Sequence, residues 1–333
     1  MKIVCLCEIA VTPAVMEPMR ELEARGAQVV ILEDKSIQTP EAFTEAMIKL
    51  ERQGADAWPA DPQFVEEARD ADIVVVHVSP VNAAVLRTAG RLKYVAVLRS
   101  GVENVRQDLC AQMGIEIINA PGRSALAVAD CTVALMLAEM KNIARGHRAL
   151  MDGRWVKLFA NSEYIHDLCN CTVGIVGAGQ IGRKVIDRLR GFECGILVHD
   201  PFLPDGEIAR LGCTPAPLED LLRRSDIVSL HLRLSEQTRR FISKRELGLM
   251  KPTAMLVNTS RGGLVDEGAL AEALRDRTIG GAALDVFTEE PLGAGSPLLR
   301  LDNVTLTPHI AGTSADTCPN SVKIIKGELM KLL

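Results

Sequence analysis

Three polar residues near the C-terminal end of the chain are of types that carry acid–base chemistry. Arg261, Glu290 and His309 each follow a short apolar run bounded by Gly or Pro. Runs of this kind are typical of buried parallel strands, and open α/β sheets bind their ligands at the carboxyl ends of such strands. We therefore expect the three side chains to converge on one crevice, where they would clamp a carboxylate and move a proton.

The residue types suggest how this work would be divided. A carboxylate beside a histidine favours the protonated ring and orients it, so Glu290 would tune His309. The fork of Arg261 matches a carboxylate bidentately. The small residues Ala311 and Gly312, after Ile310, would let a ligand approach His309 closely. The alternative is that Arg261 is a surface residue of a glycine loop and that Glu290 is solvated beside Glu289.

A glycine pattern upstream predicts a dinucleotide for these residues to face. Gly177, Gly179 and Gly182 form GxGxxG, which here follows an apolar strand and opens a helix, the context that makes the pattern informative. Gly177 permits a tight turn, Gly179 lets the backbone approach a pyrophosphate, and Gly182 lets the helix pack closely. The helix start, with Gln180 and Ile181, would offer free amides to the phosphates. The alternative is a tight glycine turn without a ligand.

Two strand ends refine the cofactor prediction. The strand after the glycine motif ends at Asp200, whose carboxylate would accept the ribose hydroxyls and repel a 2′-phosphate. No Arg or Lys lies within the five following residues, which favours NAD over NADP. His231 ends the strand over 226–232 and is expected either to border the cofactor or to be structural. Asp200 could also simply start a turn.

Composition narrows the class of protein. The 333 residues allow two domains, and 47% apolar with 24% charged residues is ordinary for a soluble globular protein. A net charge of −5 and few aromatic residues argue against nucleic-acid binding. No signal peptide or membrane span is expected. The nine cysteines, without a CxxC pair, indicate free thiols in a cytoplasmic protein, and no metal site is expected.

The order of apolar and helical segments predicts an α/β fold. Residues 1–98 alternate strand and helix, which indicates a compact unit with a parallel sheet. From Cys171 onward the alternation is regular and predicts a doubly wound nucleotide-binding domain. A long helix over 125–150 is apolar nearly all round, so we expect it to be buried, as a dimer contact rather than as an internal core helix.

The motifs in their order resemble one known family. GxGxxG at 177–182, Asn-Thr-Ser-Arg-Gly-Gly-Leu-Val-Asp at 258–266, Asp-Val-Phe-x-x-Glu-Pro-Leu at 285–292 and Pro-His-Ile-Ala-Gly at 308–312 are similar to those of the D-isomer-specific 2-hydroxyacid dehydrogenases. Phosphoglycerate dehydrogenase-like members are the nearest group. The resemblance covers roughly residues 95–333, and the N-terminal part matches mainly in architecture.

The resemblance implies a fold and a division of labour. A doubly wound, Rossmann-type NAD domain over 99–311 would be inserted into a smaller, flavodoxin-like α/β substrate domain formed by 1–98 and 312–333. Arg261 would hold the substrate's carboxylate and carbonyl. His309 would carry the proton of the 2-hydroxyl, and Glu290 would orient and charge the ring.

Further residues acquire roles through the same resemblance. Asp285 would hold the nicotinamide carboxamide, with Thr259 and Gly312 also at the cofactor. The loop Arg99-Ser100-Gly101 would bind the substrate carboxylate through its backbone amides. The helix over 125–150 matches the family's dimerisation helix, so a homodimer is expected. The loop 99–104 is shorter than usual, and Arg233 stands where many members have Pro.

The predicted activity is reversible hydride transfer between nicotinamide and C2 of a small 2-hydroxy or 2-keto acid of the 3-phosphoglycerate, hydroxypyruvate or glyoxylate type. Arg99, Arg106 and Arg123 lie near the expected pocket and would suit a phosphate. The alternative is an NAD(H)-binding regulator similar to the C-terminal binding protein corepressors, which keep the same three residues. Formate dehydrogenases, with Gln in place of Glu290, are disfavoured.

Overall fold

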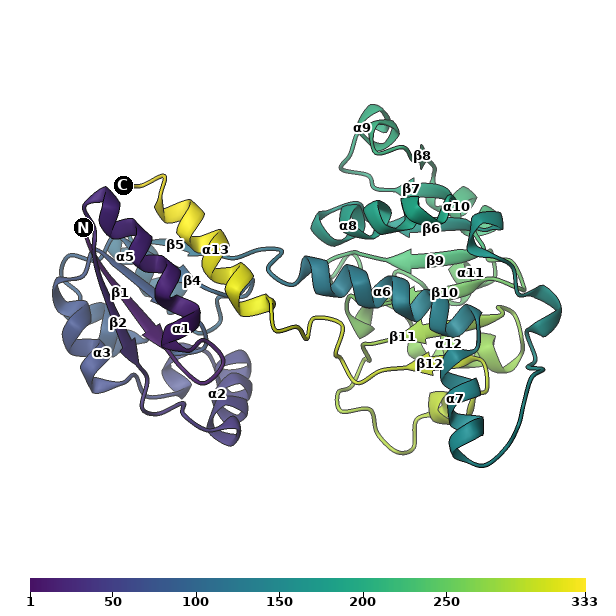
Figure 1. Ribbon diagram of the computed structural model, residues 1–333, viewed down its shortest axis with the longest axis horizontal. Coiled ribbons are helices and arrows are strands. Elements are labelled where there is room, and N and C mark those ends of the chain that lie inside the picture. The colour runs from purple at the N-terminus through teal and green to yellow at the C-terminus, as the bar shows by residue number, and fades with distance from the viewer. The chain divides into compact units, whose positions relative to one another are not determined.

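The computed structural model describes residues 1–333, which form two compact units. The first comprises Met1–Ser124 and Ser314–Leu333, and the second comprises Ala125–Thr313. The second unit is thus inserted into the first, and both chain ends belong to the first unit (Figure 1). The insertion agrees with the predicted architecture.

The first unit is built on one parallel sheet with strand order β2-β1-β3-β4-β5. Its strands are β1 (Lys2–Cys7), β2 (Gln28–Glu33), β3 (Ile73–Val76), β4 (Tyr94–Val97) and β5 (Glu116–Asn119). This is the flavodoxin-like order, whose direction of winding reverses between β1 and β3. All four residues of β3 are buried, as expected for a parallel strand covered on both faces.

Helices begin in this unit at clear sequence signals. Thr39, Asp61 and Asn82 cap three of them by accepting backbone amides. The C-terminal helix α13 packs on α1 and the 3-10 helix η1, and it buries Val322 and Ile325 in the core of this unit (Figure 1). The helices are α1 (Pro13–Met16), η1 (Glu17–Arg25), α2 (Pro40–Gln53), η2 (Ala55–Ala57), α3 (Pro62–Glu67), η3 (Ala68–Asp70), α4 (Ala83–Thr88), α5 (Gln107–Met113) and α13 (Thr317–Leu329).

The division between the units lies later in the chain than predicted. The resemblance places residues 99–124 in the NAD domain, but β5 pairs with β4 along its whole length, beginning with Glu116 opposite Tyr94. The strand therefore completes the first sheet, and α5 leads into it. The division falls at 124/125 instead of 98/99, and the return falls at 313/314 instead of 311/312.

The second unit contains a seven-stranded parallel sheet with order β12-β11-β10-β9-β6-β7-β8. Its strands are β6 (Thr172–Val176), β7 (Gly195–His199), β8 (Thr214–Pro215), β9 (Ile227–Leu230), β10 (Met255–Asn258), β11 (Gly281–Leu284) and β12 (Val304–Leu306). The strand order reverses between β6 and β9, which is the doubly wound arrangement that the sequence predicts. Two apolar cores cover the two faces of this sheet.

The second unit has seven α-helices and five short 3-10 segments. No helix of the protein combines the length and the apolar character needed to cross a membrane. The helices are α6 (Ala125–Met140), α7 (Ile143–Met151), η4 (Ser162–Tyr164), η5 (Leu168–Asn170), α8 (Gln180–Leu189), η6 (Arg190–Phe192), α9 (Asp205–Arg210), α10 (Leu218–Arg224), α11 (Lys244–Leu247), η7 (Gly262–Leu264), α12 (Glu267–Arg275) and η8 (Pro297–Arg300).

The long helix predicted over 125–150 consists of two helices. The first, α6, ends at Met140, and Asn142 adopts a left-handed conformation with φ of 56° before α7 starts at Ile143. Helix α6 packs on α8 and on β10, β11 and β12, and it buries Val133 and Met136 there. Packing within the unit therefore accounts for much of its apolar character.

Candidate active site

The glycine-rich turn lies between β6 and α8, as predicted. Gly177 has φ of +93°, and a Cβ added there would lie 2.8 Å from the His231 carbonyl oxygen. A Cβ added at Gly182 would collide with the Gly177 carbonyl oxygen. The turn and the first turn of α8 are thus packed so closely that a side chain fits at neither position.

The same turn presents open space and free donors on its other side. A Cβ at Gly179 would meet no atom within 4 Å. The amides of Gly179, Gln180 and Ile181 donate no hydrogen bond within the protein. A helix start with free amides and a positive dipole end is suited to phosphate. The residues present therefore fit the pyrophosphate of a dinucleotide.

Asp200 lies beside this turn, at the end of β7. Its Oδ2 accepts the Ala178 amide at 2.9 Å, and its Oδ1 accepts the Phe202 amide at 3.0 Å. The carboxylate thus joins the end of β7 to the glycine turn. Each carboxylate oxygen keeps a lone pair that could accept a further hydrogen bond. The contact of Asp200 with the ribose hydroxyls therefore stays a prediction, and the two observed bonds leave room for it.

His231 follows β9 on the opposite side of the glycine turn. Its Nε2 lies 3.0 Å from Ser229 Oγ, and its Nδ1 is buried without a partner although part of the residue is exposed. Burial lowers the pKa of this imidazole to about 4. The ring is therefore neutral near pH 7, and it borders the cofactor turn as an uncharged group.

The hydroxyl of Thr259 is directed at helix α6. Thr132 Oγ1 donates to the Val128 carbonyl at 2.7 Å, so the Thr259 hydroxyl, 2.7 Å from Thr132 Oγ1, must be the donor of that pair. The single proton of Thr259 is thereby used within the unit. The cofactor contact of Thr259 stays a prediction, in which its hydroxyl could still accept a hydrogen bond.

Asp285, which follows β11, fixes the segment that carries His309. The buried carboxylate accepts the Thr307 hydroxyl at 2.5 Å and the amides of Ile310 and Ala311 at 2.9 and 2.8 Å. Its predicted contact with the nicotinamide carboxamide stays a prediction, as does that of the partly exposed Gly312. The positioning role was missed, because an isolated Asp at a strand end gives no signal of partners about two dozen residues away.

His309 and Glu290 form the acid–base pair of the site. His309 Nδ1 lies 2.7 Å from Glu290 Oε2, while Glu290 Oε1 accepts the Phe287 amide at 3.0 Å. An ionised carboxylate only accepts, so Nδ1 carries the proton and Nε2 is left free to meet a ligand. The His309 side chain is 47% exposed, which makes that nitrogen accessible.

The contacts of Glu290 keep it ionised. Its partial burial alone would raise the carboxyl pKa, but the hydrogen bonds from His309 and from the Phe287 amide, with the nearby charge of Arg261, lower it further than burial raises it. The pKa of Glu290 therefore lies below its usual value. A charged carboxylate is thus held against the imidazole at neutral pH.

Arg261 follows β10 and completes the set. Its guanidinium donates from Nη1 to the Ser260 carbonyl at 2.7 Å, and no carboxylate lies within ion-pair distance. Its remaining donors are therefore available to a ligand. The side chain of Asn258 shapes the turn by accepting the Ser260 amide and donating to the Arg261 carbonyl, both at 3.0 Å.

A close approach of two loops brings Arg261 toward Glu290. A Cβ added at Gly262 would collide with the backbone of Phe287, whose amide binds Glu290. The loops after β10 and β11 therefore touch where only glycine fits. The strands β10, β11 and β12 are neighbours in the sheet. The second unit thus brings Arg261, Glu290 and His309 together at one edge of its sheet.

The predicted substrate loop belongs to the first unit. The amides of Ser100, Gly101 and Val102 donate no hydrogen bond within the protein. The loop is held by its neighbours instead, since Asn119 Nδ2 donates to the Ser100 carbonyl at 2.6 Å and Ser100 Oγ donates to the Ala120 carbonyl at 3.3 Å. Three free amides in an ordered loop fit the carboxylate that they are predicted to bind.

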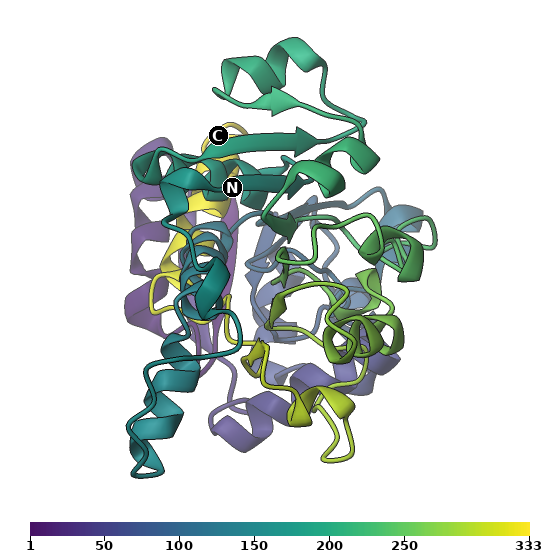
Figure 2. The ribbon, with the colours of Figure 1, turned by 90° about the vertical axis from the view of Figure 1, so that its right-hand side faces the viewer.

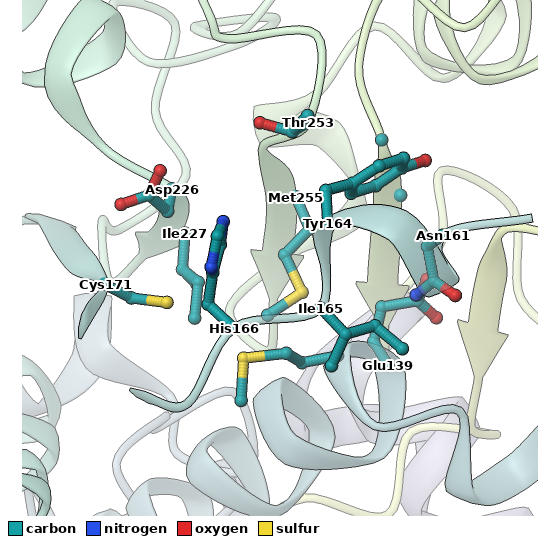
Figure 3. A pocket seen from close by; sticks show the side chains of 13 residues that line it. Glu139, Asn161, Tyr164, Ile165, His166, Cys171, Asp226, Ile227, Thr253 and Met255 are labelled. Atoms are coloured by element: carbon teal, nitrogen blue, oxygen red, sulfur yellow. The ribbon is translucent and has the colours of Figure 1, made fainter. Parts of the chain in front are cut away.

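A small cavity of about 50 Å³ lies at the opposite edge of the second sheet, where β9, β10 and β11 begin (Figure 3). Its acidic residues already have partners. Asp226 pairs with Lys251 at 2.7 Å, and Glu139 pairs with Arg145 at 2.5 Å. The cavity is too small for a dinucleotide, and both of these carboxylates are already paired with cations.

Comparisons with known proteins agree with this geometry. A family model described as D-isomer specific 2-hydroxyacid dehydrogenase, NAD binding domain, matches residues 133–311. A glyoxylate reductase from Korarchaeum cryptofilum is 36% identical over 277 residues, which cover 83% of each chain. A D-3-phosphoglycerate dehydrogenase from Methanocaldococcus jannaschii is 36% identical over 274 residues, 81% of this chain, and the chain spans about half (51%) of that relative's length.

A solved structure shows the same fold over the whole chain. It is a D-isomer specific 2-hydroxyacid dehydrogenase from Lactobacillus delbrueckii ssp. bulgaricus in its NAD-complexed form, with a TM-score of 0.77 and 24% identity, covering 100% of this chain and 97% of the other. The chain thus belongs to the D-isomer-specific 2-hydroxyacid dehydrogenases. It is an NAD-dependent oxidoreductase of D-2-hydroxy acids, which confirms the predicted family, fold class and cofactor.

Proposed function

We propose that the protein interconverts small 2-keto acids and D-2-hydroxy acids of the glyoxylate, hydroxypyruvate or 3-phosphoglycerate type, with Arg261, Glu290 and His309 as its catalytic residues. The observation that carries this proposal is the 2.7 Å bond between Glu290 and His309 Nδ1, which leaves His309 Nε2 free for the substrate. Arg261, which has no carboxylate partner, keeps donors for the same ligand. The names of the relatives, glyoxylate reductase and D-3-phosphoglycerate dehydrogenase, support the substrate class.

The proton path follows from the tautomer of His309. In oxidation, Nε2 accepts the proton of the substrate's 2-hydroxyl, and in reduction it returns that proton to the carbonyl oxygen. Glu290 stabilises the charged ring that forms between these steps. The free donors of Arg261 hold the carboxylate and polarise the carbonyl.

The glycine turn, the start of α8 and Asp200 would hold the cofactor. When bound, NAD accepts a hydride from C2 of the hydroxy acid, and NADH supplies it to the keto acid. The protein's own task is to align the reacting atoms and to exclude water around them. The carboxylate of Asp200 would disfavour a 2′-phosphate, in keeping with NAD.

Substitution of Glu290 by Gln is expected to move the pH dependence of keto-acid reduction. Reduction requires a proton on His309, and the ionised carboxylate favours that proton. Without the charge, the protonated ring loses the carboxylate that stabilises it, so the alkaline fall in rate should begin at a lower pH than in the wild type. Initial rates at saturating NADH over a pH series measure the shift. An alkaline limb at the same pH in both proteins would contradict the role given to Glu290.

A screen of NADH oxidation over 2-keto acids, with and without a terminal phosphate, tests the proposed function. Turnover of at least one such acid is expected. If NADH binds tightly but no keto acid is reduced, the NAD(H)-sensing regulator becomes the better account, and assays of protein partners with and without NADH would follow.

We also propose that the protein is a homodimer whose contact centres on α7 and the segment that follows it. Helix α7 lies at an outer edge of the second unit in both views (Figures 1 and 2). Large apolar side chains there are solvent-exposed, and such patches mark protein contacts. They are Ile143, Leu150, Met151, Trp155 and Leu158, which are 56–80% exposed. We therefore place the proposed dimer contact on α7 and not on α6, because α6 is largely buried within the unit.

Substitution of both Trp155 and Leu158 by Glu is expected to convert the dimer into a monomer, because two charges cannot be buried unpaired in an apolar contact. Sedimentation velocity measures the change. Ile48→Glu, at an exposed apolar position on α2, is the matched control and should leave the dimer intact. A monomeric wild type, or a dimer that survives the double substitution, would refute this contact.

The nine free cysteines support a reducing, cytoplasmic location for the protein.

A further inference from the structure

Four chemically capable side chains gather at the carboxyl edge of the first sheet. Glu8 follows β1, His77 follows β3, Arg99 follows β4, and Arg123 lies beyond β5. The edge includes the reversal of strand order between β1 and β3, where open α/β sheets bind ligands. Glu8, His77 and Arg99 are nearly fully buried.

His77 links a carboxylate to a guanidinium. Its Nδ1 lies 2.7 Å from Glu8 Oε1, and its Nε2 lies 2.9 Å from Arg123 Nη1. An arginine can only donate, so Nε2 must be the acceptor and Nδ1 must carry the proton. Burial lowers the pKa of His77, with a contribution from the nearby Arg123 and Arg99, although Glu8 opposes the shift. A neutral ring with one defined tautomer therefore holds the guanidinium of Arg123 in place.

The two arginines have donors that no protein group uses. Arg123 has no carboxylate within ion-pair distance, and its hydrogen-bond partner is the neutral His77 ring. Its burial and the nearby charge of Arg99 lower its pKa, partly offset by Glu8. Arg99 is paired through Nη2 with Glu51 at 2.6 Å, but its Nη1 is buried without any partner. An unsatisfied buried N–H of a cation is costly unless a ligand meets it.

Arg106, the third arginine of the sequence prediction, does not belong to this set. It forms ion pairs with both Asp56 and Asp108, the latter at 2.6 Å, and these bonds raise its pKa. Its charge is therefore already matched by protein carboxylates. The expectation that all three arginines face a phosphate is corrected to Arg99 and Arg123.

We propose that Arg99 and Arg123 bind a second acidic group of the substrate, a carboxylate or a phosphate distant from the reacting carbon. The inference rests on the proposed function, and the free amides of residues 100–102 are the predicted binding site of the first carboxylate. Hydrogen bonds from the Ala120 amide to the Arg99 carbonyl and from Ser100 Oγ to the Ala120 carbonyl join the segments that carry the two arginines. The preferred substrates are then diacidic 2-keto acids.

Matched pairs of keto acids test this specificity in the full-length enzyme. Phosphohydroxypyruvate is compared with hydroxypyruvate, and 2-ketoglutarate with 2-ketobutyrate, since each pair differs in one acidic group. Arg123→Gln should lower kcat/KM for the diacid about tenfold more than for its monoacid partner. Arg123→Lys should restore part of the loss, because it keeps the charge without the fork. Arg106→Gln is the control and should leave both ratios as in the wild type.

The pattern of results separates the possible failures. A selective loss for the phosphorylated acid identifies a phosphate, and one for the dicarboxylic acid identifies a carboxylate. Equal losses for diacid and monoacid, or no loss, overturn the inference while the proposed function stands. If no keto acid is reduced at all, the proposed function fails. Calorimetric titration of 3-phosphoglycerate and of D-glycerate into wild type and Arg123→Gln then still decides whether the arginines bind the second acid.

Discussion

Replacement of His309 by Ala is expected to reduce turnover by about a hundredfold or more, with NADH binding unchanged. General acid–base catalysis by a positioned side chain contributes about that much. The accessible Nε2 of His309 is the group placed to exchange the substrate proton, because Nδ1 is bound to Glu290. The glycine turn that would hold the dinucleotide lies outside this pair and should be unaffected. Steady-state rates, with NADH titrations followed by fluorescence, measure both quantities.

His166→Ala provides the matched control for this prediction. His166 is an exposed histidine of the same unit, at the opposite edge of the sheet, where it lines the small cavity (Figure 3). Its loss should leave turnover near the wild-type value. Undiminished turnover in His309→Ala would remove His309 from the mechanism. A loss of NADH binding in that variant would indicate a structural disturbance, which the melting temperature would reveal.

Replacement of Arg261 by Gln is expected to lower kcat/KM by about a hundredfold to a thousandfold. A preorganised donor aimed at charge that develops on an oxygen is typically worth that much. The guanidinium of Arg261 uses one donor on the Ser260 carbonyl and has no carboxylate partner, so its remaining donors are free for the substrate. Kinetics with the best keto acid of the screen measure this loss of kcat/KM. Most of the loss should be seen with small substrates as well as with large ones.

Two further variants show whether the geometry of Arg261 matters beyond its charge. Arg261→Lys keeps a cation but loses the planar fork, so it should recover only part of the activity. Arg239→Gln removes an exposed arginine of the same unit, which is paired only with Glu236. This substitution should change kcat/KM very little. A fully active Arg261→Lys would mean that charge alone suffices. An unimpaired Arg261→Gln would contradict the substrate contact.

Local patterns were sufficient to predict the catalytic constellation. Arg261, Glu290 and His309 follow three successive apolar runs, and those runs became the adjacent strands β10, β11 and β12. In a parallel sheet the carboxyl ends of neighbouring strands share one edge. The side chains could therefore be placed together without knowledge of any long-range contact. The glycine turn was equally local, since its spacing and context specify both the turn and the helix start.

Long-range contacts account for what the sequence did not predict. Asp285 accepts its hydrogen bonds from residues up to 26 positions away, and Arg106 is paired with Asp56, 50 positions distant. Neither partnership follows from a local pattern. The pairing of β5 with β4 likewise decided the boundary between the units. The interruption between α6 and α7 depends on Asn142 in a left-handed conformation, with no Gly or Pro to signal it.

The most direct test of the central claim is the configuration of the product. The enzyme is incubated with NADH and hydroxypyruvate, and the loss of NADH is compared with the amount and the handedness of the glycerate formed. We predict one D-glycerate for each NADH oxidised, formed about a hundredfold more slowly or slower still by His309→Ala. L-glycerate, or tight binding of NADH without reduction of this or any other 2-keto acid, would contradict the assignment of this site to D-2-hydroxyacid chemistry.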